Sequence, residues 1–90
     1  MPTIHVPGLF KYYLEDQTEI RLTGWTVGEV LQALVGEFPK IQPHIFDGNS
    51  QLRRHINLFV NNENIRDLNG LDTQVSESDI IKIVPAVTGG

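Results

Sequence analysis

The chain has 90 residues, 40% of them hydrophobic and 20% charged, with 7 basic against 11 acidic side chains and a formal net charge of -4. This length fits one domain with a single hydrophobic core. Because the chain has no cysteine, disulfides, thiolate catalysis, Cys-ligated zinc and iron–sulfur clusters are excluded, and the acidic balance argues against nucleic acid as the main partner.

Two short strands are predicted before the first helix. Residues 3–6 alternate in polarity, and residues 18–22 do so more regularly, which places Ile20 and Leu22 on the inner side. Pro7-Gly8 interrupts the first strand at a bulge or at its end. The aromatic segment 9–13 is compatible with an extension of that strand or with a loop.

A helix is predicted from Thr26 to Phe38. Thr26 is a good N-cap, and Glu29 completes a Thr-x-x-Glu capping box. Pro39 marks the end of the helix. One apolar stripe at helical spacing consists of Val27, Val30, Leu31, Leu34, Val35 and Phe38. Since two glycines weaken this helix, it needs a surface to lie on, and that surface must be a sheet because no second helix of similar length is visible.

The segment after the helix is predicted to be a long connector, residues 39–54, followed by a strong strand at residues 55–60. Three apolar residues of the connector are expected to tuck under the sheet through one helical turn: Ile41, Ile45 and Phe46. The inner face of the strand consists of Ile56, Leu58 and Val60.

Two more strands are predicted toward the C-terminus. After a turn at residues 61–64, Ile65-Arg66 begins a short return strand. A polar turn at residues 76–79 leads into a last strand from Ile80 to Val84, with Lys82 facing solvent. The expected fold class is α+β, one domain spanning residues 1–84, in which one main helix packs on one face of a mixed sheet.

The side chains offer no convincing catalytic site. His5, His44 and His55 lie in different elements without the spacing of metal ligands, so no metal site is expected. Motifs for nucleotide binding or for a catalytic nucleophile are absent, and the carboxylate pair Glu15-Asp16 fits a solvated turn. The basic spot at residues 53–55 is interpreted as a solvated strand entrance. We therefore expect neither an independent enzyme nor a bound cofactor.

Targeting signals are also absent from the sequence. No apolar run approaches the roughly 18–20 residues of a membrane span, and the N-terminal MPTIHV lacks the pattern of a secretory signal. Together with the lack of cysteine, this predicts a cytoplasmic protein without a membrane partner.

The C-terminus is the most distinctive part of the sequence. Pro85 removes a backbone donor and should take the chain out of the sheet, so that residues 85–90, PAVTGG, form a flexible tail with a reach of about 20 Å. Gly89 and Gly90 lack Cβ atoms, so this end can pass through a narrow channel into the active site of another protein. The Gly90 carboxylate is a poor electrophile and must be activated, for instance as an acyl-adenylate, with ATP supplied by a partner.

The segments INLFVNNENIR and SESDIIKIVPAVTGG, the helix after a β-hairpin and the Gly-Gly end resemble ubiquitin-like sulfur carriers of the MoaD/ThiS type. The likeness covers nearly the whole chain in element order and is most specific from His55 to Gly90. The pattern of VN closing the third strand, GL-x-T and PAV-x-GG is most similar to the CysO-like branch, which serves cysteine biosynthesis.

This resemblance implies a β-grasp (ubiquitin-like) fold and a mechanism. A partner similar to ubiquitin-activating enzymes adenylates Gly90 while Val87, Thr88 and Gly89 thread into it, and a sulfur donor converts the adenylate to a thiocarboxylate. The sulfur then passes to an acceptor on a second enzyme. In the CysO-like branch that enzyme is a pyridoxal-phosphate (PLP)-dependent cysteine synthase, and a metalloprotease releases the product.

A docking surface is predicted beside the tail. Phe59 faces outward because its strand neighbours face inward, and Val84 shares the outer side of its strand with Lys82 and Ile80. If the two strands are neighbours, as in β-grasp proteins, these residues form a small exposed apolar patch that a partner can contact. Single exposed hydrophobic side chains are also common without any function.

Other functions remain open at this point. A ubiquitin-like modifier joined to lysines through Gly90 would use the same activation, and a plain interaction subunit would carry a tail without function. Among the carriers, a small subunit of molybdopterin synthase or a thiamine-type carrier would look similar.

Overall fold

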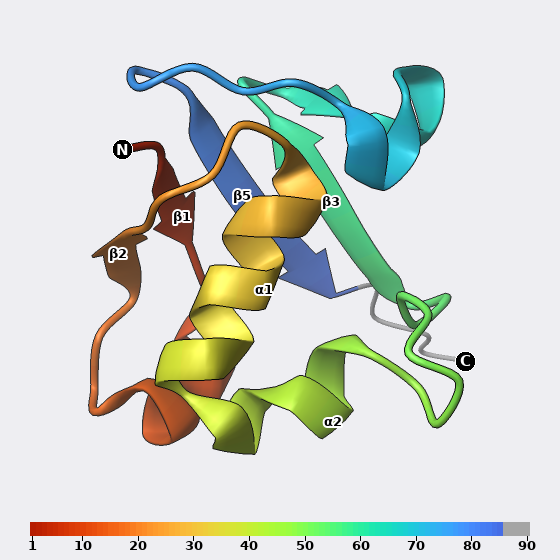
Figure 1. Cartoon of the computed structure of the whole chain (residues 1–90). Coiled ribbons are helices and arrows are strands. Elements are labelled where there is room, and N and C mark those ends of the chain that lie inside the picture. Colours follow the sequence, from red (N-terminus) through yellow and green to blue (C-terminus); the bar gives the residue numbers. More distant parts are fainter. Residues whose placement is uncertain (86–90) are drawn as a thin grey trace.

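The computed structural model describes residues 1–85, which form a five-stranded sheet with one long helix lying across one face (Figure 1). The strands are β1 (Thr3–His5), β2 (Glu19–Arg21), β3 (Ile56–Val60), β4 (Glu63–Asn64) and β5 (Ile80–Pro85), in the spatial order β2-β1-β5-β3-β4. β1 and β5 are parallel and the other neighbouring pairs are antiparallel, so the sheet is mixed. The predicted α+β architecture is confirmed.

The long helix, α1 (Val27–Glu37), begins and ends where the sequence predicts. The Thr26 Oγ1 atom accepts a hydrogen bond from the Glu29 N–H (3.2 Å), and the Glu29 carboxylate accepts one from the Trp25 N–H (2.7 Å). These two bonds satisfy backbone donors that a helix leaves unpaired at its start. Phe38 leaves the helical conformation just before Pro39.

The core fills the space between α1 and the inner face of the sheet. The buried face of α1 consists of Val27, Val30, Leu31 and Leu34. The strands present their inner residues at every second position, as the alternation predicts. These buried residues are Ile4, Ile20, Ile56, Leu58, Val60, Ile81 and Ile83. Burial on the sheet explains how a helix with two glycines is stable here.

Helical turns close the lower end of the core. The aromatic segment left open by the sequence is a 3₁₀ helix, Gly8–Leu14, which buries Phe10 and Leu14. The connector after α1 contains a 3₁₀ turn (Pro39–Ile41) and the short helix α2 (Gln42–Ile45). Its three apolar residues, Ile41, Ile45 and Phe46, are buried as predicted.

The predicted return strand at residues 65–66 is wrong. The strand, β4, occupies residues 63–64, and the chain then forms a 3₁₀ turn (Ile65–Asp67). The Asn64 Oδ1 atom accepts a hydrogen bond from the Arg66 N–H (2.9 Å), which bends the backbone out of the strand. Ile65 is only 3% exposed, so burial of its side chain favours the turn.

The predicted end of the last strand at Val84 is also wrong, by one residue. β5 continues through Pro85, which lies opposite Ile56 of β3. β1 pairs with β5 only as far as Lys82, so beyond that point β5 has a neighbour on one side only. Proline lacks a donor but is tolerated along such an edge. The sheet therefore includes the first residue of the segment predicted to be a tail.

Candidate functional site at the end of β5

The residues predicted to react and to thread into a partner, Val87, Thr88, Gly89 and Gly90, lie outside the described residues. The structure describes the point from which this segment starts. Pro85 ends β5 beside Ile56, the first residue of β3, and Val84 lies opposite Asn57. The surface around these residues is therefore the described part of the chain that borders the start of the C-terminal segment.

The predicted docking residues do lie together on the outer face of the sheet. β3 and β5 are neighbours, and Val84 is 42% exposed while Phe59 and Ile80 are half-buried. Phe59 lies opposite Lys82, and Ile80 and Val84 lie two residues to either side of Lys82 on β5. The three apolar residues thus surround Lys82, which the sequence places on the same outer side of its strand. Whether a partner docks here stays a prediction.

Lys82 gives this outer patch, Phe59, Ile80, Lys82 and Val84, a mixed character. Its ammonium group lies 3.4 Å from the Asn62 Oδ1 atom in the turn between β3 and β4. A lysine stem can cover apolar neighbours while its charge stays in water. The patch is therefore suited to a partner surface that pairs an apolar centre with a carboxylate.

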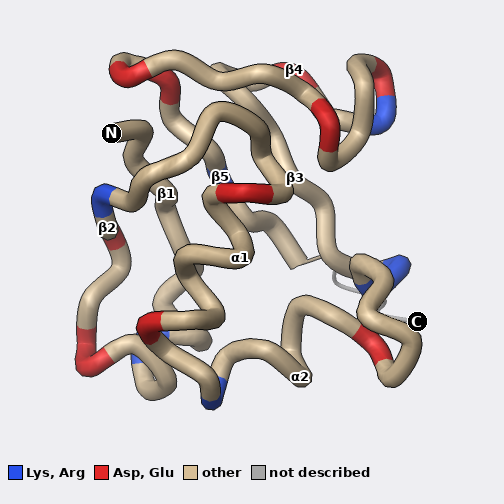
Figure 2. Tube along the Cα trace, in the orientation of Figure 1, with Lys and Arg blue, Asp and Glu red and all other residues tan. Residues whose placement is uncertain are grey.

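Arginine side chains border the patch where β3 begins. The Arg66 guanidinium donates to the Asn57 Oδ1 atom (2.6 Å) and to the Arg54 carbonyl oxygen (3.1 Å). Since Asn57 lies opposite Val84, these bonds hold a cation beside the outer patch. Figure 2 shows basic residues just before β3, near the end of β5. Sequence analysis noticed residues 53–55 but missed Arg66, whose reach depends on the turn after β4.

The start of β5 is fixed by Asp79. Its carboxylate accepts hydrogen bonds from the Ser76 N–H (2.8 Å) and from the Asn61 amide group (2.7 Å). These bonds, that of Ser76 first, hold the pKa of Asp79 below its usual value. The Asn61 Oδ1 atom in turn accepts from the Ile80 N–H (3.0 Å), so the β3–β4 turn and the start of β5 are tied together.

The histidines are dispersed, as the sequence predicts. The His5 imidazole lies 3.6 Å from the Glu19 carboxylate, and His44 stacks on Tyr13 with a centroid separation of 4.2 Å. Within residues 1–85, no three His, Asp or Glu side chains come close enough together to hold a metal ion. Over the same residues, no helix has both the length and the apolar composition for crossing a membrane.

Comparison with known proteins gives consistent matches over nearly the whole chain. The model of the ThiS family matches residues 4–90. The sulfur carrier protein CysO of Mycobacterium tuberculosis is 31% identical, with 98% of this chain and 97% of that protein covered.

Solved structures show the same fold. A chain of the BexX/CysO complex of Amycolatopsis orientalis gives a TM-score of 0.90 at 28% identity. The match covers 100% of this chain and 100% of that one. The small archaeal modifier protein 1 of Methanosarcina acetivorans gives a TM-score of 0.85 at 33% identity, over 99% of this chain and 95% of that one. The fold is thus the β-grasp fold that the sequence predicts.

Proposed function

We propose that the chain carries sulfur as a thiocarboxylate on Gly90, because it belongs to the ThiS family of small β-grasp sulfur carriers and ubiquitin-like modifiers. The observation that carries the proposal is the family match, which extends through the terminal Gly-Gly to residue 90. The likeness to CysO over nearly the full length of both proteins supports cysteine biosynthesis as the pathway.

The proposed chemistry needs two steps on the Gly90 carboxylate. A carboxylate oxygen first attacks the α-phosphorus of ATP, forming an acyl-adenylate and releasing pyrophosphate. A sulfur donor then attacks the acyl carbon, AMP leaves, and a thiocarboxylate remains once the sulfur is freed from its donor. In this proposal the chain serves as the co-substrate, and partner enzymes bind the ATP and the sulfur donor.

The outer patch supplies the docking surface in this proposal. It runs along β5 from Ile80 to Val84, next to Pro85, from which the C-terminal segment continues, so a partner that binds it can take up Val87, Thr88 and Gly89. The existence of a structure of a CysO in complex with another protein supports partner binding by this type of carrier. Proposed partners are an adenylyltransferase similar to ubiquitin-activating enzymes, a PLP-dependent cysteine synthase and a metalloprotease that releases product, all in the cytoplasm.

The proposal is tested by mass spectrometry of the full chain purified from its native cells. We expect a fraction in which one carboxylate oxygen of Gly90 is replaced by sulfur, located by fragmentation to the C-terminal residue. Deletion of Gly90, or addition of one residue after it, should abolish sulfur loading while the thermal midpoint stays unchanged. Sulfur transfer by a chain that lacks Gly90 would contradict the proposal. An acceptor enzyme that copurifies with the chain would identify the pathway and would distinguish cysteine biosynthesis from a molybdopterin or thiamine route.

A second function is favoured by the likeness to an archaeal modifier protein at 33% identity. In this alternative, the activated Gly90 carbonyl is attacked by a lysine amine of a target protein, and an isopeptide bond forms. The same mass spectra separate the two functions, because a modifier leaves Gly90 attached to lysine-containing peptides of other proteins.

A further inference from the structure

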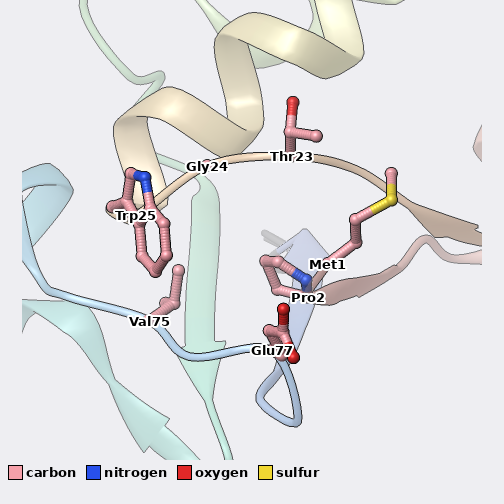
Figure 3. Close-up of a pocket in the computed structure, with 7 residues that line it drawn as sticks. All are labelled: Met1, Pro2, Thr23, Gly24, Trp25, Val75 and Glu77. Carbon is pink, nitrogen blue, oxygen red and sulfur yellow. The ribbon is translucent and has the colours of Figure 1, made fainter.

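A shallow hollow of about 210 Å³ lies at the end of the sheet where β1 and β5 begin. Figure 3 shows Trp25 on one side of the hollow, Met1, Pro2 and Glu77 on the other, and Val75 at its base. Trp25 is 74% exposed, although it is the chain's single tryptophan and its largest apolar side chain. Pro85 is at the opposite end of β5, so this hollow is separate from the point where the C-terminal segment starts.

The backbone holds Trp25 firmly in this exposed position. Its N–H donates to the Glu29 carboxylate (2.7 Å), and its carbonyl accepts from the Val75 N–H (3.0 Å). The preceding residue, Gly24, has φ +154° and packs so tightly on α1 that a Cβ there would lie 2.7 Å from the Val30 Cγ2 atom. These contacts fix the backbone that presents the indole, and exposed tryptophan is enriched at binding hot spots.

The charge around the hollow identifies the kind of ligand. Glu77 contributes a carboxylate to the wall facing Trp25. Within residues 1–85 the one ion pair joins His5 to Glu19, so no cationic group of this part of the chain lies within 4.0 Å of Glu77. An indole face attracts a cation, and a carboxylate can pair with the same cation.

From these observations we infer that the Trp25–Glu77 hollow binds an arginine side chain of a protein partner. The guanidinium stacks on the indole of Trp25 and donates to the Glu77 carboxylate, and the methylene stem lies over Val75. Arginine fits better than lysine because its planar group can stack and form hydrogen bonds at once. The inference stands independently of the proposed function, because Gly90 takes no part in it.

The test uses the full chain and a matched pair of small probes, acetyl-arginine methylamide and acetyl-citrulline methylamide. Citrulline has nearly the same shape without the charge. Binding is followed by the fluorescence of the single tryptophan and by NMR shifts of its indole N–H and of the Glu77 amide. We expect a saturable response that is roughly threefold to tenfold weaker for citrulline and that weakens with added salt.

Two variants and one control locate the binding. Trp25→Ala should remove the response at the Glu77 amide, and Glu77→Gln should make the two probes bind equally. Glu63→Gln, which removes a carboxylate on β4, should leave the preference for arginine unchanged. Equal binding of both probes to the unmodified chain, or an unchanged preference in Glu77→Gln, would overturn the inference. So would tryptophan fluorescence that changes with protein concentration alone, because the hollow would then be covered by a second copy of the chain.

Discussion

Replacement of Val84 by aspartate tests the outer patch with little disturbance of the fold. Val84 is 42% exposed, so the loss of its buried part costs about 1 kcal/mol, and the poor strand propensity of aspartate adds up to about 1 kcal/mol. The new carboxylate can pair with Lys82, two residues away on the same face of β5, and this attraction offsets part of the lost stability. We expect a total loss of about 1–2 kcal/mol in the free energy of unfolding.

Partner binding should suffer more than folding. Burial of a neutral polar group against an apolar surface without a hydrogen bond costs about 2 kcal/mol or more, and an ionised carboxylate costs more still. We therefore expect Kd to weaken by at least roughly 30-fold. The assay is calorimetric titration of the unmodified chain and of Val84→Asp with the adenylating enzyme, alongside urea unfolding of each chain. Thr18→Asp is the control, because it adds the same charge at an exposed position next to β2, the opposite edge strand.

Two results would refute this reasoning. If Thr18→Asp weakens binding as much as Val84→Asp, net charge rather than the outer patch governs association. If Val84→Asp loses more than about 4 kcal/mol of stability, Val84 is part of the core packing. Phe59→Asp should also weaken binding more than folding, but it is a less selective test because Phe59 is half-buried.

Three further predictions concern the elements that hold these surfaces in place. Gly24→Ala should lower the free energy of unfolding by about 2–4 kcal/mol in urea titrations, because its Cβ would meet Val30. The control Gly36→Ala has open space around it and should raise the free energy of unfolding by about 0.5–1 kcal/mol. Equal effects of the two substitutions would contradict the close packing at Gly24. Thr26→Ala should cost about 1 kcal/mol through the lost N-cap, and an unchanged thermal midpoint would contradict this role. The pKa of Asp79 is lowered in the folded state, so its contribution is present above the unfolded value of about 3.9 and is lost as the pH falls through the folded value. Asp79→Asn should therefore be less stable than the unmodified chain at pH 7, by less than about 1 kcal/mol because the carboxylate is largely solvated, and this difference should shrink as the pH falls below about 3.9.

Most of the architecture follows from local patterns in the sequence. Ile56, Leu58 and Val60 alternate with polar or outward residues, and Thr26 and Glu29 mark the start of α1, so these elements could be predicted without tertiary information. The ends of strands could not. β5 includes Pro85 because β1 stops pairing at Lys82, and the length of a neighbouring strand is not visible in the residues of β5 themselves.

Side-chain partners from distant segments were the other limit. Arg66 reaches Asn57 and the Arg54 carbonyl only because a 3₁₀ turn follows β4, where sequence analysis predicted a strand. Trp25 drew no prediction, because its exposure and its fixed backbone depend on pairing with Val75, far along the chain. The signal in the sequence is a lone tryptophan next to a glycine in a polar loop. This signal becomes informative only when the pairing of Trp25 with Val75 is known.

The two surfaces have different consequences for a carrier that must visit several enzymes. In the proposed function, any enzyme that acts on Gly90 binds the outer patch, so we expect successive enzymes to compete for it. The Trp25–Glu77 hollow lies at the opposite end of β5 from Pro85, so we expect a partner bound there to leave the start of the C-terminal segment accessible. A carrier with separate ends can thus remain attached to one protein while its C-terminus reacts with another.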